Sequence, residues 1–423
     1  MIEKLKNITY HLLRRGEKIT GVDNVYYAKG GFWMTLGYGI NIIKGLAISI
    51  LMANLLDREI YGYYKYILSI FSLVAIFSLG GLSTAVSQAV AREYDGVFKK
   101  AIKTVLRWSW IGSIFLLALA FYYYQKNNST FTWSFIILAI SFPWYSISLY
   151  YGGILSGKKK FNIQTKYYAI YSLLSAIAIL SAVVFTKNIF WIIFAFAVSD
   201  AIIGGFLTWY SSKKYLHNDK VDPESIKYGI NLSLIGMISI IAQNIDKIIL
   251  PIFLGYQELA VYAIALVAPE QIKALLKNVG PLTLPKFAVK EINQDVKNKI
   301  LWTILKSLLP VAGIIVIYYI SAPWLYKLVY PLYPDAIQYS RILSLSLIMI
   351  VPSALISSFL QAHKQTRLIF TDNIFNSTIQ ILSIIICVYL WGLWGLIFAR
   401  IINRLAMIGF EIYLLKKTKL TEY

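Results

Sequence analysis

The stretch FWMTLGYGINIIKGLAISILMANLL, residues Phe32–Leu56, is apolar over the length of a membrane span. A bilayer core of roughly 30 Å needs about 20 helical residues. One cation, Lys44, interrupts the stretch near its centre. A charge at that depth costs roughly 2.5–3.5 kcal/mol on insertion scales, so such residues usually face a polar interior and mark a site. We therefore predict that Lys44 faces a cavity that holds phosphate.

The composition places the whole chain in the membrane. Of its 423 residues, 58% are hydrophobic and 14% are charged, and the mean hydropathy is +0.62. An ordinary soluble domain has roughly 25% charged residues. The net charge of +21 does not indicate a nucleic-acid partner, because most of the charges fall between apolar runs. Here they report membrane topology.

The sequence contains no recognisable motif for binding a cofactor or for catalysis. Cys387 is the one cysteine, and the three histidines, His11, His217 and His363, lack metal-ligand spacing. No carboxylate pair, nucleophile-base pair or Gly-rich phosphate loop stands out in the segments between apolar runs. We predict a protein that is not an enzyme and has no cofactor, with coupling to H⁺, Na⁺ or the membrane potential left open.

Sustained alternation at strand period is absent, so we predict an all-α integral membrane fold of about twelve transmembrane helices. The predicted spans are residues 30–55, 61–89, 104–125, 132–155, 165–186, 189–211, 226–254, 258–282, 300–321, 337–361, 368–389 and 393–415.

The most polar connection, SSKKYLHNDKVDPESIKYG at residues 211–229, separates the sixth span from the seventh. The predicted segments are an interfacial N-terminal segment 1–29, six-helix halves 30–211 and 226–415, a cytoplasmic linker 212–225 and a tail 416–423. A similar turn follows the first span of each half, LLDREIYGYY at Leu55–Tyr64 and FLGYQELAVYA at Phe253–Ala263. Two parallel repeats would place a site between them near the midplane.

Lysine and arginine residues predict the orientation. With the N-terminus inside, 29 of the 41 Lys and Arg residues flank inner loops and 6 flank outer loops. Short cytoplasmic loops retain positive charge, so both termini are predicted to be cytoplasmic. The first 18 residues, MIEKLKNITYHLLRRGEK, mix basic and apolar residues. They predict a short helix bound to anionic lipid, with a disordered tail as the alternative.

Polar residues form stripes inside two spans. Asn41 and Gly37 lie on the same helix face as Lys44, and Ser239, Gln243, Asp246 and Lys247 form a second stripe in the seventh span. Asp246 and Lys247 point about 100° apart, so each needs a partner elsewhere. Glu270 and Lys273 form an i,i+3 pair. Lys277, nearer the inner end of that span, is expected to reach the interface.

Arg400 and Arg404 lie one turn apart on the last span and repel each other. They need an acidic neighbour, such as Asp200, or a bound anion. Substrate contact is predicted for Lys44, Asn41, Gln243, Lys247, Arg400 and Arg404. Ion coupling or charge pairing is predicted for Asp200, Asp246, Glu270 and Lys273. Internal pairing or snorkelling is the alternative for the cations. A phosphate or diphosphate suits arginine forks and lysine point charges best.

The segment MANLLDREIYGYYKYILSIFSLVAIFSLGGLSTAVSQAVAREY, Met52–Tyr94, resembles the polysaccharide-exporter branch of the multidrug/oligosaccharidyl-lipid/polysaccharide (MOP) flippase superfamily. In that family an acidic turn is followed by aromatic-Gly-x-Tyr and then by Gly-Leu-x-x-Ala. These motifs are carried here by Tyr61, Gly62 and Tyr64, and by Gly81, Leu82 and Ala85. Further similar segments are NIDKIILPIFLG with Asn244, Asp246 and Lys247, GILSGKKKF at Gly153–Phe161, and LYPDAIQYSRILSLS at Leu332–Ser346.

The resemblance implies a MATE-like fold and a Wzx-type flippase in the bacterial cytoplasmic (inner) membrane. Its cargo would be undecaprenyl-diphosphate-linked oligosaccharide, such as an O-antigen or capsule repeat unit. The implied partners are this lipid-linked oligosaccharide, membrane lipid and other polysaccharide-assembly membrane proteins. A lipid II flippase and a cation-coupled multidrug exporter on the same fold are the alternatives. A multi-span polysaccharide polymerase or ligase is disfavoured because the longest outer loop, around residues 322–336, has only about 15 residues.

Overall fold

The computed structural model describes residues 24–280, 283, 287 and 294–418. These residues form helices and connecting turns, and none of them lies in a β-strand. Within this described part, 11 helices are long and apolar enough to cross a membrane. The chain is therefore a multi-pass membrane protein. The predicted surface helix in the first 18 residues lies outside the described residues.

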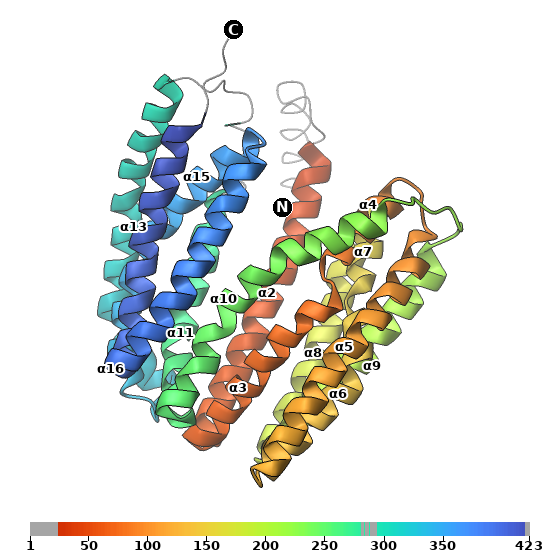
Figure 1. Cartoon of the computed structure of the whole chain (residues 1–423), viewed down its shortest axis with the longest axis horizontal. Coiled ribbons are helices and arrows are strands. Elements are labelled where there is room, and N and C mark those ends of the chain that lie inside the picture. Colours follow the sequence, from red (N-terminus) through yellow and green to blue (C-terminus); the bar gives the residue numbers. More distant parts are fainter. Residues whose placement is uncertain (1–23, 281–282, 284–286, 288–293, 419–423) are drawn as a thin grey trace, which may run out of the picture. The chain divides into compact units, whose positions relative to one another are not determined.

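Figure 1 shows the helices in chain order, coloured from red to blue. They are α2 (Asn24–Leu55), α3 (Arg58–Val74), η1 (Ala75–Ser78), α4 (Gly81–Ala91), α5 (Val97–Gln125), α6 (Ser129–Ser148), α7 (Tyr150–Gly157), α8 (Phe161–Thr186), α9 (Ile189–Tyr215), α10 (Ser225–Leu254), α11 (Tyr256–Lys277), α13 (Gln294–Val329), α14 (Ala336–Leu345), η2 (Ser346–Met349), α15 (Ile350–Ala362) and α16 (Thr366–Lys417).

Helix α16 accounts for two of the predicted spans. It has 52 residues, but Trp391 and Gly392 in its middle have non-helical backbone angles, with Gly392 at φ 57°. A side chain at Gly395 would collide with the carbonyl oxygen of Cys387. Eight residues of straight helix would separate these positions by about 12 Å, so the chain bends sharply between them. The predicted spans 368–389 and 393–415 are the two arms of α16.

Two other predicted spans are interrupted by a turn. The span 61–89 consists of α3, η1 and α4, with Leu79 at φ 49° beside the flexible pair Gly80 and Gly81. The span 132–155 is divided into α6 and α7. There the Thr208 hydroxyl donates to the Ile147 carbonyl at 3.0 Å and accepts from the Tyr151 amide at 3.2 Å. A side chain inserted into the helix ladder is a known cause of such a kink.

The predicted span 337–361 changes its winding in the middle. Helix α14 ends at Leu345, the 3₁₀ turn η2 follows, and α15 begins at Ile350. Pro352, in the first turn of α15, has no amide proton, and its ring would crowd the carbonyl of residue 348 in a continuous α-helix. The tighter 3₁₀ turn avoids this clash.

The chain divides into two compact units. Unit 1 contains the described residues up to Ile48 together with Phe77–Thr186 and Phe190–Ser233. Unit 2 contains Ser49–Ile76, Lys187–Ile189 and the described residues from Leu234 onward. The end of α2 and all of α3 thus belong with the second half of the chain in space. The division into six-helix halves at residues 212–225 and the cytoplasmic location of both termini stay predictions.

Unit 1 is built around α4, which packs against α7, while α5 and α6 lie side by side (Figure 1). Its core includes Leu82, Val86 and Ile154. Gly81 of the family-like motif lies against α10, where its amide donates to the Ser233 hydroxyl at 3.0 Å. A side chain at Gly81 would lie 2.7 Å from the Gly229 carbonyl oxygen. The glycine is therefore required by close helix packing.

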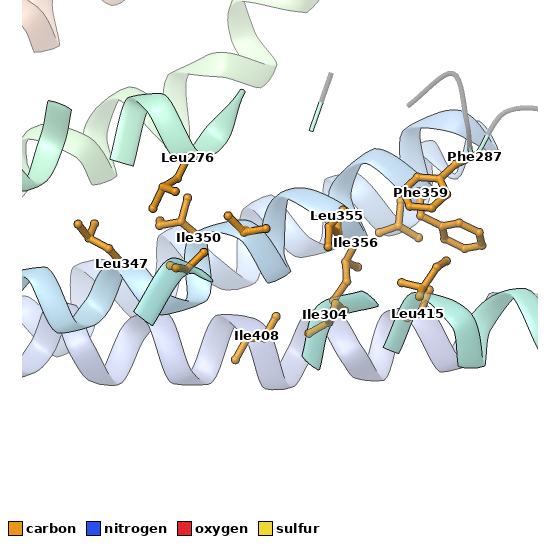
Figure 2. Packing of buried hydrophobic residues seen from close by; sticks show 14 of the residues in the cluster. Leu276, Phe287, Ile304, Leu347, Ile350, Leu355, Ile356, Phe359, Ile408 and Leu415 are labelled. Carbon is orange, nitrogen blue, oxygen red and sulfur yellow. The ribbon is translucent and has the colours of Figure 1, made fainter. Parts of the chain in front are cut away.

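The core of unit 2 is an apolar cluster shared by α11, α13, α15 and α16. Figure 2 shows Leu355, Ile356 and Phe359 of α15 gathered with Ile304 of α13 and Leu415 of α16. The relative exposures of Ile356, Phe359 and Leu415 are 0%. This cluster fixes α15 and α16, whose polar faces line the site described below.

Candidate functional site

The ten residues that the sequence predicts for substrate contact or charge pairing are found in both units. Asn41, Lys44 and Asp200 lie in unit 1. Unit 2 contains the other seven: Gln243, Asp246, Lys247, Glu270, Lys273, Arg400 and Arg404. Six of these seven line a single cavity, and Asp246 lies behind its wall.

The unit 2 cavity has a volume of about 660 Å³ and is lined mainly by α10, α11, α15 and α16. Five of its lining residues are cationic, three are acidic and ten are uncharged and polar. The cations are Lys247, Lys273, Lys277, Arg400 and Arg404, and the acids are Glu270, Asp372 and Glu411. The lining thus has a positive excess, and its serine, asparagine and glutamine side chains supply hydrogen bonds.

Arg400 is the centre of an ion-pair network on one wall of the cavity. It pairs with Asp246, whose side chain is 0% exposed, and with Glu270 at 3.2 Å. Asp246 also accepts from the Tyr262 hydroxyl at 2.6 Å, and Glu270 pairs with Lys273 at 2.7 Å. A buried carboxylate needs such partners to stay in a membrane helix.

This network corrects one expectation and supports another. The sequence suggests Asp200 as the acid beside the arginine pair, but the Asp200 carboxylate accepts from the Ser175 hydroxyl and the partners of Arg400 are Asp246 and Glu270. The sequence proposal was wrong because acids at similar predicted depth cannot be ranked without helix contacts. The predicted i,i+3 pair of Glu270 and Lys273 is confirmed.

Three cations of the cavity have no carboxylate within 4.0 Å among the described residues: Lys247, Lys277 and Arg404. Arg404 contacts the Met407 sulfur at 3.4 Å. Lys277 also lines the cavity, and its reach to the membrane interface stays a prediction. Cations without carboxylate partners in a membrane protein are costly unless an anion or water compensates them. They are therefore the groups of this wall that are available to an anionic ligand.

Sequence reasoning missed two acids of the cavity. Glu411 of α16 is 1% exposed and accepts from the Ser353 hydroxyl at 2.7 Å, and Asp372 accepts from the Asn376 amide at 3.0 Å. Both lie inside predicted spans, and a carboxylate within a span was the signal that could have found them.

Lys44 lies in an internal network of unit 1. Its ammonium donates to the Ser175 hydroxyl at 3.0 Å, and Ser175 donates to the Asp200 carboxylate at 2.9 Å. The ammonium also lies 5.0 Å from the centre of the Tyr171 ring, within cation–π range. Lys44 thus has internal partners for its charge, as the pairing alternative predicts. Its contact with phosphate stays a prediction.

Asn41 and Gly37 lie beside a second, smaller cavity in unit 1. This cavity has a volume of about 330 Å³ and includes Tyr38, Tyr151 and Tyr168 in its lining. The side chain of Asn41 accepts from the Tyr168 hydroxyl at 2.7 Å. None of the residues that line it is charged. The polar stripe predicted from the sequence therefore divides, with Asn41 at a neutral cavity and Lys44 in a charged network.

The unit 2 cavity has the groups needed to bind an anion with attached hydroxyl groups. It can hold a phosphate-like anion through its free lysine and arginine groups and can contact hydroxyl groups through its amides. Among the described residues, no group of three or more His, Cys, Asp or Glu side chains has the geometry of a metal site. Recognition by charge and hydrogen bonds is what this arrangement provides.

Comparison with known proteins identifies the family. The sequence model of the family described as "Polysaccharide biosynthesis protein" matches residues 27–268, more than half of the chain. No curated protein sequence matches the chain.

Several solved structures share the fold at low identity. An inward-facing multidrug resistance MATE family transporter of the MOP superfamily is 16% identical over 89% of this chain and 95% of its own, with a TM-score of 0.67. A MOP superfamily transporter from Pyrococcus furiosus, described as having a binding pocket of reverse polarity, is 16% identical over 93% and 96%, with a TM-score of 0.60. A MATE protein in the bent conformation is 15% identical over 93% and 96%, with a TM-score of 0.60.

These similarities confirm the predicted all-helical, MATE-like architecture. The chain belongs to the polysaccharide biosynthesis protein family and has the fold of the MOP superfamily of membrane transporters.

Proposed function

We propose that this protein is a flippase that moves undecaprenyl-diphosphate-linked oligosaccharide repeat units from the cytoplasmic to the outer leaflet of the bacterial inner membrane. Its cargo is an O-antigen, capsule or related polysaccharide precursor. The supporting observation is the cavity of about 660 Å³ in unit 2, in which Lys247, Lys277 and Arg404 lack carboxylate partners among the described residues.

The charge of the cavity suits a diphosphate. Three cations without acidic partners can contact the oxygens of a diphosphate group, and Arg404 offers the planar fork that binds phosphate in a bidentate way. Carrying two negative charges outward across a potential of about 100 mV, inside negative, is favoured by about 4.6 kcal/mol. The membrane potential therefore favours export of this cargo.

The uncharged polar residues of the cavity suit the sugar part of the cargo. Ten Ser, Asn and Gln residues line it, among them Gln243, Asn376 and Gln380. Hydroxyl and amide groups pair with sugar hydroxyls, while the prenyl chain can stay in the lipid. Alternating access between bundles, as transporters of repeat architecture use, supplies the movement.

The rival cargoes are a cationic drug and lipid II. Multidrug transporters are among the solved structures with this fold, so a drug exporter is the main alternative function. A cationic drug would be repelled by the positive excess in this cavity. Lipid II has the same prenyl diphosphate as the proposed cargo. The charge of the cavity therefore does not distinguish the two cargoes, and only the sugar part can.

The test is a flipping assay in liposomes that contain the purified protein and a fluorescent undecaprenyl-diphosphate-linked oligosaccharide. Lys247→Gln combined with Arg404→Gln should reduce flipping at least tenfold, because an ion-paired phosphate contact is worth roughly 1.5–3 kcal/mol. Lys327→Gln, an exposed cation of α13 outside the cavity lining, is the matched control. Undiminished flipping by the double variant, or uptake of a cationic dye in its place, would overturn the proposal. Parallel assays with lipid II decide between the two cargoes.

A further inference from the structure

The neutral cavity of unit 1 has the features of a small binding site. Its volume of about 330 Å³ lies within the range of small-molecule pockets, roughly 300–1,000 Å³. It is formed by α2, the junction of α6 and α7, and the start of α8. Gly37 and Gly152 contribute no side chain to its wall, which leaves room for a flat ligand beside the helix backbone.

Two amide side chains of this cavity have defined orientations and unused donors. The Asn41 amide oxygen accepts from the Tyr168 hydroxyl at 2.7 Å, and the Gln164 amide oxygen accepts from the Ser156 hydroxyl at 2.9 Å. Among the described residues, neither amide NH₂ group donates to a protein acceptor. Each amide oxygen accepts one of these hydrogen bonds, and the NH₂ groups are the unused donors that these residues can offer a ligand.

Aromatic rings complete the wall. Tyr38, Tyr151 and Tyr168 line the same cavity as the two amides, and the lining has no charged residue. Tyrosine rings offer an apolar face with a polar tip, which suits a ligand that has C–H groups on one face and hydroxyl groups at its edge. An acyl chain would leave both amide NH₂ groups without acceptors, which is unfavourable in an apolar environment.

The geometry points to a subsite for an uncharged sugar ring in the unit 1 cavity, with the Asn41 and Gln164 amides donating to sugar hydroxyl or acetamido oxygens. This inference deepens the proposed function, on which it rests, because it assigns the recognition of neutral sugar to unit 1 and that of the anion to the cations of unit 2.

The experiment uses soluble probes, so that each cavity is tested by itself. Binding of the uncharged disaccharide N,N′-diacetylchitobiose and of inorganic pyrophosphate to the full-length protein in lipid nanodiscs is measured by saturation-transfer NMR and calorimetry. The wild-type protein should bind both. Asn41→Leu with Gln164→Leu should weaken disaccharide binding about tenfold, as expected for two lost hydrogen bonds, and leave pyrophosphate binding unchanged.

A second variant fills the cavity and keeps the amides. Gly37→Leu adds a side chain where the nearest atoms, those of Thr165, lie 3.8 Å from the added Cβ, and leucine is a better helix former than glycine. It should also abolish disaccharide binding in a folded protein. Gln125→Leu, an exposed amide at the end of α5, is the control and should bind the disaccharide normally.

The outcomes separate this inference from the proposed function. Unchanged disaccharide binding in both variants, or no saturable disaccharide binding by the wild type, overturns the sugar subsite. A loss of pyrophosphate binding in the amide variants would assign the cavity to the anion and also overturn it. Loss of pyrophosphate binding in Lys247→Gln with Arg404→Gln supports the anion site of unit 2, whatever the disaccharide does.

Discussion

Arg400 forms one ion pair with Asp246, whose side chain is completely buried, and a second with Glu270, whose side chain is 38% exposed. Removing one partner of a buried pair leaves an uncompensated charge and costs about 3–5 kcal/mol. We expect Asp246→Asn to lower the free energy of unfolding by about this amount in detergent micelles. Glu270→Gln should cost about 1 kcal/mol or less because that pair is partly solvated. Equal losses would contradict the assignment of Asp246 as the buried anchor of the wall.

The Lys44 network makes a separate prediction. Lys44→Met leaves Asp200, which is 4% exposed, without a nearby cation and should lower the melting temperature. Adding Asp200→Asn should restore most of the loss, since the buried charge is then also removed. The melting temperature of both variants and their flipping activity are measured together. Wild-type stability with lost flipping in Lys44→Met would favour the substrate contact that the sequence predicts.

Gly62 of the Tyr61-Gly62-x-Tyr64 motif fixes the contact between α3 and α11. A side chain at this position would collide with the backbone carbonyl of Tyr256. Gly62→Ala should therefore destabilise the protein by about 1–3 kcal/mol, the usual range for overpacking. Gly236→Ala, at a helical glycine with open space around it, should stabilise by about 0.5–1 kcal/mol. Shifts of the same sign in the two melting temperatures would refute this role of Gly62.

Asp95, in the loop between α4 and α5, holds the connection between α9 and α10 in place. It is 1% exposed, pairs with Lys158 at 2.9 Å and accepts from the His217 amide at 2.9 Å. Asp95→Asn should weaken these bonds by about 1.5–3 kcal/mol and speed hydrogen exchange in residues 216–220. Asp219→Asn removes an exposed partner of Lys99 from the same connection and should leave the exchange of its neighbours unchanged. Equal exchange in both variants would contradict the prediction.

The predicted cytoplasmic linker is thus not a free tether in the structure. The amide of Gly96 donates to the Lys220 carbonyl at 2.9 Å, and the Asp95 amide donates to the Asn218 side chain at 3.2 Å. Composition alone indicates a polar connection at this place. It carries no information on which other loop the connection binds.

The sequence predicted several residues of the unit 2 cavity because membrane helices accept few charges. Each charged residue within a span stands out, and six of the ten predicted residues line one cavity. Which acid pairs with which cation was not predictable in the same way. Asp200 and Asp246 are both aspartates within spans, and only the packing of α10 against neighbouring helices shows that Asp246 reaches Arg400.

The sequence by itself determined the membrane class, the helical fold and the approximate spans, because a lipid bilayer requires about 20 apolar residues per helix and satisfied backbone hydrogen bonds. Tertiary structure decided the break at Leu149, where the Thr208 hydroxyl of α9 donates to the Ile147 carbonyl and accepts from the Tyr151 amide. It also decided that Ser49–Ile76 packs with the second half of the chain and that Asn41 and Lys44 have different surroundings. Such contacts join residues far apart in the chain, and helical periodicity indicates only which face a residue lies on.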